Sequence, residues 1–66
     1  DGLTGYRMLA NLGQRFLEPQ GRLFAEIGWQ QGPEVVVLFQ QAGWLNPRLL
    51  VDLDGRDRVI CADKPI

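Results

Sequence analysis

The fold is decided by residues 23–44, which read LFAEIGWQQGPEVVVLFQQAGW. The segment Arg22 to Ile27 is a short, nearly continuous apolar run between glycines, which predicts a strand buried on both faces. The segment Glu34 to Gly43 contains three consecutive valines, typical of a strand, yet its apolar residues keep helical spacing. Pro33 lies where helices commonly begin, and Gly43 lies where a left-handed residue commonly ends them. We therefore expect a helix here.

The amino-terminal segment is also predicted to be helical, from Leu3 to Leu17. Its apolar residues recur every three or four positions and line one face. Gly13 lies inside this pattern, where glycine costs about 1 kcal/mol relative to alanine, so we expect close packing at that position. Pro19 and Gly21 then end the helix.

Two apolar runs near the carboxyl end flank Asp54-Gly55, a dipeptide typical of hairpin turns. The predicted strands are Arg48 to Leu53 and Arg58 to Ala62. A two-residue turn would place Asp52 opposite Asp57, and facing like charges destabilise a sheet. We therefore expect a longer loop, roughly from Leu53 to Asp57. The tail from Lys64 to Ile66 is expected to fray.

The predicted order is helix, strand, helix, strand, strand, which is an α/β arrangement. The strand–helix–strand unit implies a right-handed parallel crossover, and the hairpin adds an antiparallel strand. The expected result is a three-stranded mixed sheet with two helices on one face. The other face and the outer edge of the first strand would then be uncovered. Since such surfaces promote pairing with another chain, we expect self-association.

Composition excludes several classes of function. The 66 residues form one domain at most. Seven basic and eight acidic residues give no electrostatic case for binding nucleic acid or an anionic membrane surface. No apolar run approaches the roughly 20 residues of a membrane span. The chain has no histidine, the commonest metal ligand and general base, and its one cysteine cannot form an internal disulfide. Cys61 lies in an apolar run and is expected to be structural, and a reducing cytoplasm is the expected location.

Three stretches together resemble the last third of a class I, Rossmann-like methyltransferase domain, and more narrowly the HemK-type release factor glutamine methyltransferases. They are Asp1-Gly2-Leu3 followed by Tyr6-Arg7, residues 23–32 reading LFAEIGWQQG, and residues 52–59 reading DLDGRDRV. They are similar to the family's D-G-L-x-x-Y-R helix start, its fifth strand with the following L-E-[IH]-G-x-x-Q-G turn, and its D-L-x-G-x-x-R-[VF] hairpin. The resemblance covers essentially the whole chain.

The resemblance implies an enzyme that transfers a methyl group from S-adenosylmethionine to a glutamine side-chain amide of a peptide chain release factor. In that family a glycine-rich loop holds the cofactor, and an Asn-Pro-Pro-Tyr motif holds the glutamine. The 66 residues contain neither motif, and Asn46-Pro47 is followed by Arg48 at an expected turn. We therefore expect no catalytic, cofactor-binding or metal-binding residue, and no S-adenosylmethionine bound by this chain.

The family's spatial order of these strands, five, seven, six, lies away from its ligand site. Residues 1–66 are thus expected to form a single partial domain, the carboxy-terminal portion of a methyltransferase catalytic domain. The absence of an initiator methionine before Asp1 fits this expectation of truncation.

Individual candidates for function each have a simpler structural interpretation. Glu26 is a carboxylate inside an apolar strand, and we expect it to have a hydrogen-bond partner or to reach water. Asp1, Gly2 and Tyr6 could shape a peptide-binding side in an intact enzyme, but Tyr6 is expected simply to pack its ring.

Trp29 and Trp44 flank the second helix, and an exposed tryptophan would suggest a partner surface. Trp44, directly after Gly43, instead fits the hydrophobic contact of a helix cap. The hairpin charges could imitate an acid–base site, but local ion pairs are the expected role. These charges are Asp52, Asp54, Arg56, Asp57 and Arg58.

Three hypotheses of function follow. The leading one is a catalytically incomplete methyltransferase fragment. The second is a small stand-alone interaction module that uses the same sheet edge. An unrelated small enzyme ranks last, because no nucleophile–base pair or metal-ligand set can be assembled from these residues.

Overall fold

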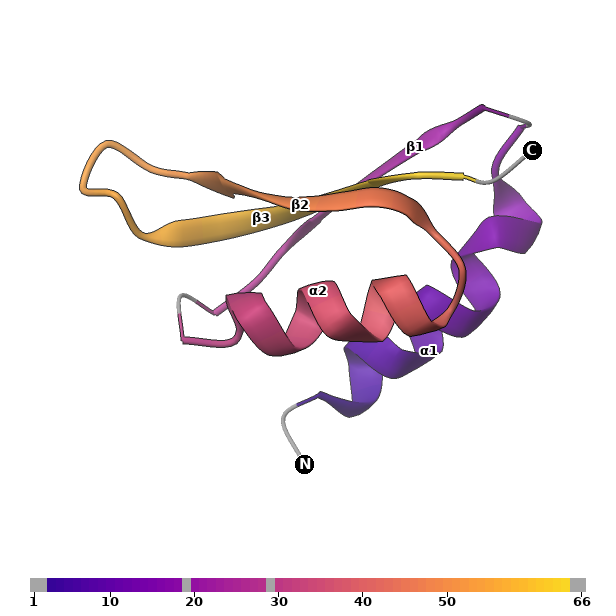
Figure 1. Ribbon diagram of the computed structural model, residues 1–66, viewed down its shortest axis with the longest axis horizontal. Helices are drawn as coiled ribbons and strands as arrows, with labels where there is room; N and C mark the ends of the chain where they lie inside the picture. The colour runs from indigo at the N-terminus through magenta and orange to yellow at the C-terminus, as the bar shows by residue number, and fades with distance from the viewer. Residues whose placement is uncertain (1–2, 19, 29, 65–66) are drawn as a thin grey trace.

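The computed structural model describes residues 3–18, 20–28 and 30–64. Its elements are α1 (Thr4–Leu12), the 3-10 helix η1 (Gly13–Phe16), β1 (Arg22–Glu26), α2 (Gly32–Gln41), β2 (Leu45–Val51) and β3 (Asp57–Asp63). Figure 1 shows both α-helices on the same side of the sheet. The predicted α/β arrangement of two helices and three strands, with the helices on one face, is therefore confirmed.

The sheet is antiparallel throughout the described residues, so the prediction of a mixed sheet is wrong. β3 lies between β1 and β2 and pairs antiparallel with each. β1 and β2 consequently run in the same direction, as a strand–helix–strand unit requires. They are not neighbours, however, so no parallel ladder forms between them.

β1 is covered on one face only, which corrects the prediction of a strand buried on both. Its side chains alternate between exposed and half-buried: Leu23 and Ala25 pack under the helices, whereas Arg22, Phe24 and Glu26 face solvent. The apolar Phe24 made the run look continuous. Since both helices lie on the same side, nothing in the described chain covers the side chain of Phe24, which is 60% exposed.

The first helix is shorter than expected, because the α-helical turns end at Leu12 and a 3-10 turn follows. Gly13 is buried at this transition. A Cβ atom there would lie 3.3 Å from Leu23 Cδ1 and 3.4 Å from Trp44 Cζ2. The close packing predicted at Gly13 is confirmed, and it joins the end of α1 to β1 and to the start of β2.

α2 ends in a Schellman motif centred on Gly43, which has a left-handed φ of 90°. The Gly43 N–H donates to the Gln40 carbonyl, and the Trp44 N–H donates to the Phe39 carbonyl, both at 3.1 Å. The rings of Phe39 and Trp44 lie 5.4 Å apart between centroids, which is the apolar contact that accompanies this cap. The predicted helix, its glycine stop and the role of Trp44 are all confirmed.

The β2–β3 connection is a five-residue loop over residues 52–56, since Val51 pairs with Asp57. The expectation of a loop longer than two residues is confirmed. β2 begins earlier than predicted, at Leu45. Asn46 and Pro47 lie inside the strand at a register shift rather than at a turn before it.

Lys64 is held in place, contrary to the expected fraying of the tail. Its N–H donates to the Gly21 carbonyl at 2.8 Å, and its ammonium donates to the Leu17 carbonyl. Pro65 and Ile66 lie outside the described residues. Lys64 therefore continues the β1–β3 ladder by one pair and fixes the segment between α1 and β1.

The core lies between the helices and the covered face of the sheet. It contains Ala10 of α1, Val35 and Phe39 of α2, and Ile60 and Ala62 of β3, with Ile27 and Trp44 completing it. Val35, Phe39 and Ile60 are completely inaccessible to solvent. Among the described residues no buried polar or charged residue interrupts this apolar layer.

Candidate functional site

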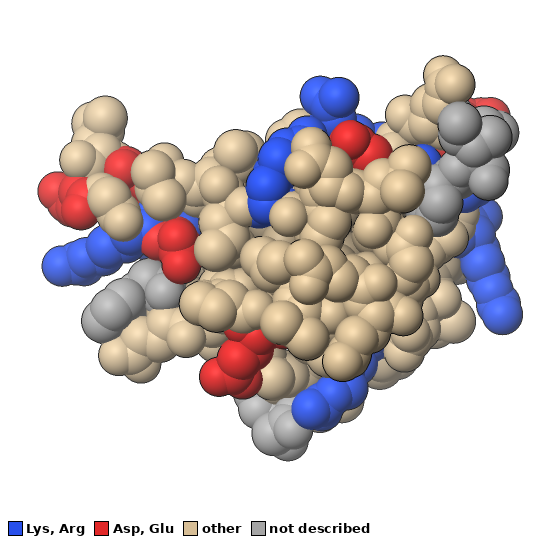
Figure 2. Space-filling view, viewed as in Figure 1, with Lys and Arg blue, Asp and Glu red and all other residues tan. Residues whose placement is uncertain are grey.

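The hairpin that joins β2 and β3 carries the densest group of charges. Figure 2 shows acidic and basic side chains together at the left end of the molecule, where this hairpin lies in Figure 1. The Asp52 carboxylate organises the loop: its Oδ1 accepts the backbone N–H groups of Asp54 at 2.9 Å and of Arg56 at 3.0 Å. Arg58 Nε donates to Asp52 Oδ2 at 3.2 Å. The structural interpretation of these charges is therefore confirmed for Asp52 and Arg58.

These hydrogen bonds favour the ionised form of Asp52. The backbone N–H of Arg56 is the main cause that lowers the pKa of the Asp52 carboxyl below its ordinary value of 3.8. The Asp54 N–H and the Arg58 guanidinium act in the same direction, against a partial loss of hydration. An acid held ionised in this way is unsuited to donate a proton near neutral pH, and its oxygens are already used to close the loop.

Asp52 should make the stability of the fold depend on pH in the acidic range. Because its pKa is lower in the folded chain, its contribution is fully present above the unfolded pKa and is lost as the pH falls through the folded value. We expect the melting temperature to fall on acidification below about pH 5, and Asp52→Asn to reduce the slope of this fall. Circular dichroism melts over a pH series measure both slopes.

The matched control for this prediction is Asp54→Asn in the same loop, which leaves the Asp52 carboxylate and its donors in place. The carboxyl chemical shift of Asp52, followed by NMR during a pH titration, reads the pKa directly. A midpoint at or above the ordinary value would contradict the prediction.

Glu26 and Tyr6 lie near each other, but the contact uses the backbone of Glu26. The Tyr6 hydroxyl donates to the Glu26 carbonyl at 3.2 Å. The Glu26 side chain is exposed, so its carboxylate reaches water. Contact with water is one of the two outcomes expected for this residue. Tyr6 is half-buried against the core, which confirms the expected packing of its ring. Asp1 and Gly2 lie outside the described residues.

Trp44 and Cys61 are both structural. Trp44 is 4% exposed, and its Nε1 donates to the Ala10 carbonyl at 2.8 Å, so the ring offers no partner surface. Cys61 is buried although it lies on the uncovered face, where Phe24 and Arg48 are its cross-strand neighbours. Trp29 lies outside the described residues.

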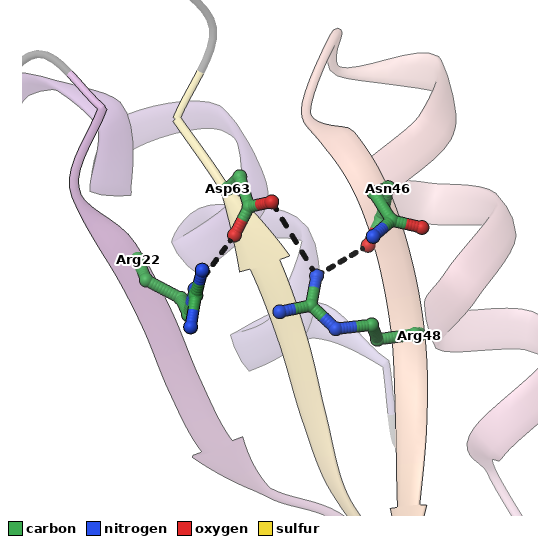
Figure 3. A network of polar contacts seen from close by, with 4 residues as sticks. All are labelled: Arg22, Asn46, Arg48 and Asp63. Carbon is green, nitrogen blue, oxygen red and sulfur yellow. Dashed lines mark hydrogen bonds and ion pairs between the residues drawn. The ribbon is translucent and has the colours of Figure 1, made fainter.

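A polar network on the uncovered sheet face was not predicted. Asp63 of β3 lies between two arginines from different strands (Figure 3): Oδ1 is 2.9 Å from Arg22 Nε, and Oδ2 is 3.5 Å from Arg48 Nη1. Arg48 Nη1 also donates to the Asn46 carbonyl at 2.8 Å. Arg22 and Asp63 are 41 positions apart, so only the strand register could have shown that they meet.

A cavity of about 240 Å³ lies between α1 and α2, which is smaller than the roughly 300–1,000 Å³ typical of small-molecule sites. It is lined by Arg7, Ala10, Asn11, Leu38, Gln41 and Ala42. Across residues 3–18, 20–28 and 30–64, no three Cys, Asp or Glu side chains gather as metal ligands would. No helix in the described ranges has the length and apolar character needed to cross a bilayer.

Comparison with known proteins relates the chain to methyltransferases. It is 46% identical over 65 residues to a release factor glutamine methyltransferase of Cereibacter sphaeroides, covering 98% of this chain and 23% of that protein. A release factor glutamine methyltransferase of Caulobacter vibrioides is 42% identical over 97% of this chain, and the match covers 22% of that protein. A bifunctional methyltransferase of Rickettsia felis is 38% identical over 91% of this chain, and the match covers 11% of that protein.

No family model matches the chain, and no solved structure matches it. The chain spans less than a quarter of the length of these relatives. The similarity extends through all six elements of the structure, from α1 to β3, because it covers nearly every residue. The resemblance expected from three short stretches is confirmed: this chain is similar, over nearly its whole length, to the carboxy-terminal part of the release factor glutamine methyltransferases.

Proposed function

We propose that residues 1–66 are a partial domain, the carboxy-terminal part of the catalytic domain of an S-adenosylmethionine-dependent methyltransferase. The whole enzyme would methylate the side-chain amide nitrogen of a glutamine in a peptide chain release factor. The observation that carries this proposal is the 46% identity over 65 residues to a protein of that name, of which the chain matches only 23%. A reducing cytoplasm, compatible with the unpaired Cys61, is the proposed location.

In this proposal the chain supplies scaffold rather than chemistry. The Asp52 carboxylate closes a hairpin loop, and the Asp63 carboxylate links strands on the uncovered face through Arg22 and Arg48. Catalysis requires groups placed within hydrogen-bond reach of the reacting atoms, whereas the Asp52 and Asp63 carboxylates are engaged in these structural contacts. The isolated chain is accordingly proposed to be inactive.

Isolated residues 1–66 should not bind S-adenosylmethionine. Isothermal titration of the chain with the cofactor should give only heats of dilution, because a cofactor of this size needs a larger, preformed cavity. A saturable heat with a dissociation constant in the micromolar range would contradict the proposal.

The positive half of the proposal is tested by a chimera. The matching carboxy-terminal segment of the Cereibacter sphaeroides relative is replaced by residues 1–66, and methylation of a release factor is measured by mass spectrometry. We expect methylation of one glutamine by the chimera and none by the same relative lacking the segment. A chimera that folds, as judged by circular dichroism, yet leaves the release factor unmodified would contradict the assignment.

A further inference from the structure

The hairpin between β2 and β3 carries a fully exposed leucine. Leu53 is the most exposed large apolar side chain in the described part of the chain, and it lies within the loop 52–56. Turns are usually built from glycine, proline, asparagine, aspartate and serine, and the other four positions of this loop are charged or glycine. The apolar surface of Leu53 is left in water, so it contributes nothing to the core.

The loop around Leu53 is held in one conformation by its own hydrogen bonds. Besides the two N–H groups that Asp52 Oδ1 accepts, the Asp52 N–H donates to the Arg56 carbonyl at 2.9 Å, and the Gly55 N–H donates to the Asp52 carbonyl at 3.0 Å. Gly55 supplies the left-handed φ of 79° that this tight turn needs. A side chain presented by an ordered loop loses less conformational entropy on binding a partner.

The base of the hairpin packs against the start of α2. A Cβ atom on Gly32, the first residue of α2, would collide with Asp57 Oδ2 and would lie 2.9 Å from Leu49 Cδ1. Glycine at this position allows the close approach, which brings the Asp57 carboxylate to the positive end of the helix dipole. The hairpin is therefore braced at its base, and Figure 1 shows it extending beyond the start of α2.

The hairpin also lies at the end of the sheet where ligands of α/β proteins bind. β1 and β2 each pair antiparallel with β3 and so run in the same direction, and the hairpin follows the carboxyl end of β2. In open α/β sheets the ligand lies beyond the carboxyl ends of the parallel strands. The active site of the proposed whole enzyme would therefore be at this same end, to one side of the hairpin.

The remaining strands of the proposed whole domain would join the sheet away from the hairpin. In a doubly wound sheet the fourth strand neighbours the fifth, which β1 resembles, whereas β3 and then β2 lie beyond β1. With strands about 4.8 Å apart, the hairpin lies roughly 10–15 Å to the side of that fourth strand. A reacting glutamine side chain does not span this gap. A protein–protein interface of about 800 Å² per partner, roughly 30 Å across, does span it.

We propose that Leu53 is a docking contact for the folded protein substrate of the whole enzyme, at a distance from the glutamine that reacts; this inference rests on the proposed function. The substrate is expected to offer an apolar pocket for the leucine side chain, with polar groups around it that face Asp54 and Arg56. Leu53 then binds the substrate equally in the ground state and in the transition state. Such uniform binding lowers KM and leaves kcat unchanged.

The test uses the chimera described above, with initial rates measured over a range of release factor concentrations. Leu53→Ser should raise the KM for the intact release factor by about tenfold and leave kcat within about twofold, because burial of a leucine side chain is lost. Leu53→Met keeps an apolar side chain and should bring KM back to within about threefold of the unmodified chimera. A five-residue peptide centred on the glutamine extends only about 7 Å to either side, so its kcat/KM should be the same with Leu53 and with Leu53→Ser.

Controls separate docking from folding and from the proposed function itself. Leu45→Ser makes the same change at the other end of β2 and should leave the KM for the release factor unchanged. Circular dichroism melts show whether each variant is folded. An active chimera whose folded Leu53→Ser variant keeps the same KM would overturn this inference alone, as would an equal loss of activity toward the peptide. A folded chimera that leaves the release factor unmodified would overturn the proposed function, and this inference with it.

Discussion

Phe39→Ala should leave most of the chain unfolded at 25 °C. Phe39 is completely inaccessible to solvent, lies at the centre of the core and packs against Trp44 at the end of α2. Truncating a buried phenylalanine costs about 3–5 kcal/mol, and a single core in a chain of this length rarely supplies more than about 3–5 kcal/mol. The expected result is loss of the helical circular dichroism signal and of any cooperative thermal transition.

Two further variants make this prediction specific to burial. Phe16→Ala removes the same atoms from a side chain that is 84% exposed, and it should change stability by no more than about 0.5 kcal/mol. Phe39→Leu keeps most of the buried volume and should remain folded with a reduced melting temperature. A Phe39→Ala variant that melted near the wild-type temperature would show that the core does not depend on this ring.

The parts of the fold that local sequence determines were predictable. α2 combines the strand propensity of three valines with apolar residues at helical spacing, and the large apolar side chains that it buries are Val35 and Phe39, four positions apart. Gly43 marked its end correctly because a left-handed residue there lets two orphan carbonyls be satisfied. The length of the hairpin loop followed from the repulsion expected between Asp52 and Asp57.

The parts that depend on which elements are neighbours were not predictable. The apolar run of β1 suggested two covered faces, but burial of Phe24 requires an element on the other side of the sheet. The described chain supplies none. Likewise, the direction of β1 and β2 followed from the strand–helix–strand unit, whereas the position of β3 between them had no local signal and was implied only by the order five, seven, six of the family resemblance. Arg22 and Asp63 meet through that same arrangement, so their network had no local signal.

The charged residues illustrate the same division. Asp52 and Arg58 are six positions apart in the hairpin, and the local ion pair expected there forms between these two residues. Glu26 was recognised as unusual because it follows an apolar run, yet its exposure depends on the uncovered face. A carboxylate in an apolar sequence therefore indicates a buried charge only when both faces of its strand are known to be covered.

Trp44→Ala should cost about 3–5 kcal/mol and should detach α1 from the rest of the fold. Trp44 connects three elements: its Nε1 donates to the Ala10 carbonyl, its Cζ2 approaches the position of Gly13, and its ring packs on Phe39. Removing the ring opens a cavity at the point where α1 meets α2 and β2. Urea unfolding followed by circular dichroism should show a large loss of stability or no folded baseline.

Trp44→Phe separates the hydrogen bond from the packing. Phenylalanine fills most of the ring volume but cannot donate, so the Ala10 carbonyl loses its side-chain partner at a cost of about 1–3 kcal/mol. Because that carbonyl belongs to α1, hydrogen exchange measured by NMR should speed up in Thr4–Leu12 well before it does in β3. Equal acceleration in both elements would mean that the chain opens only as one cooperative unit. α1 would then be held by the whole core rather than by the indole contact.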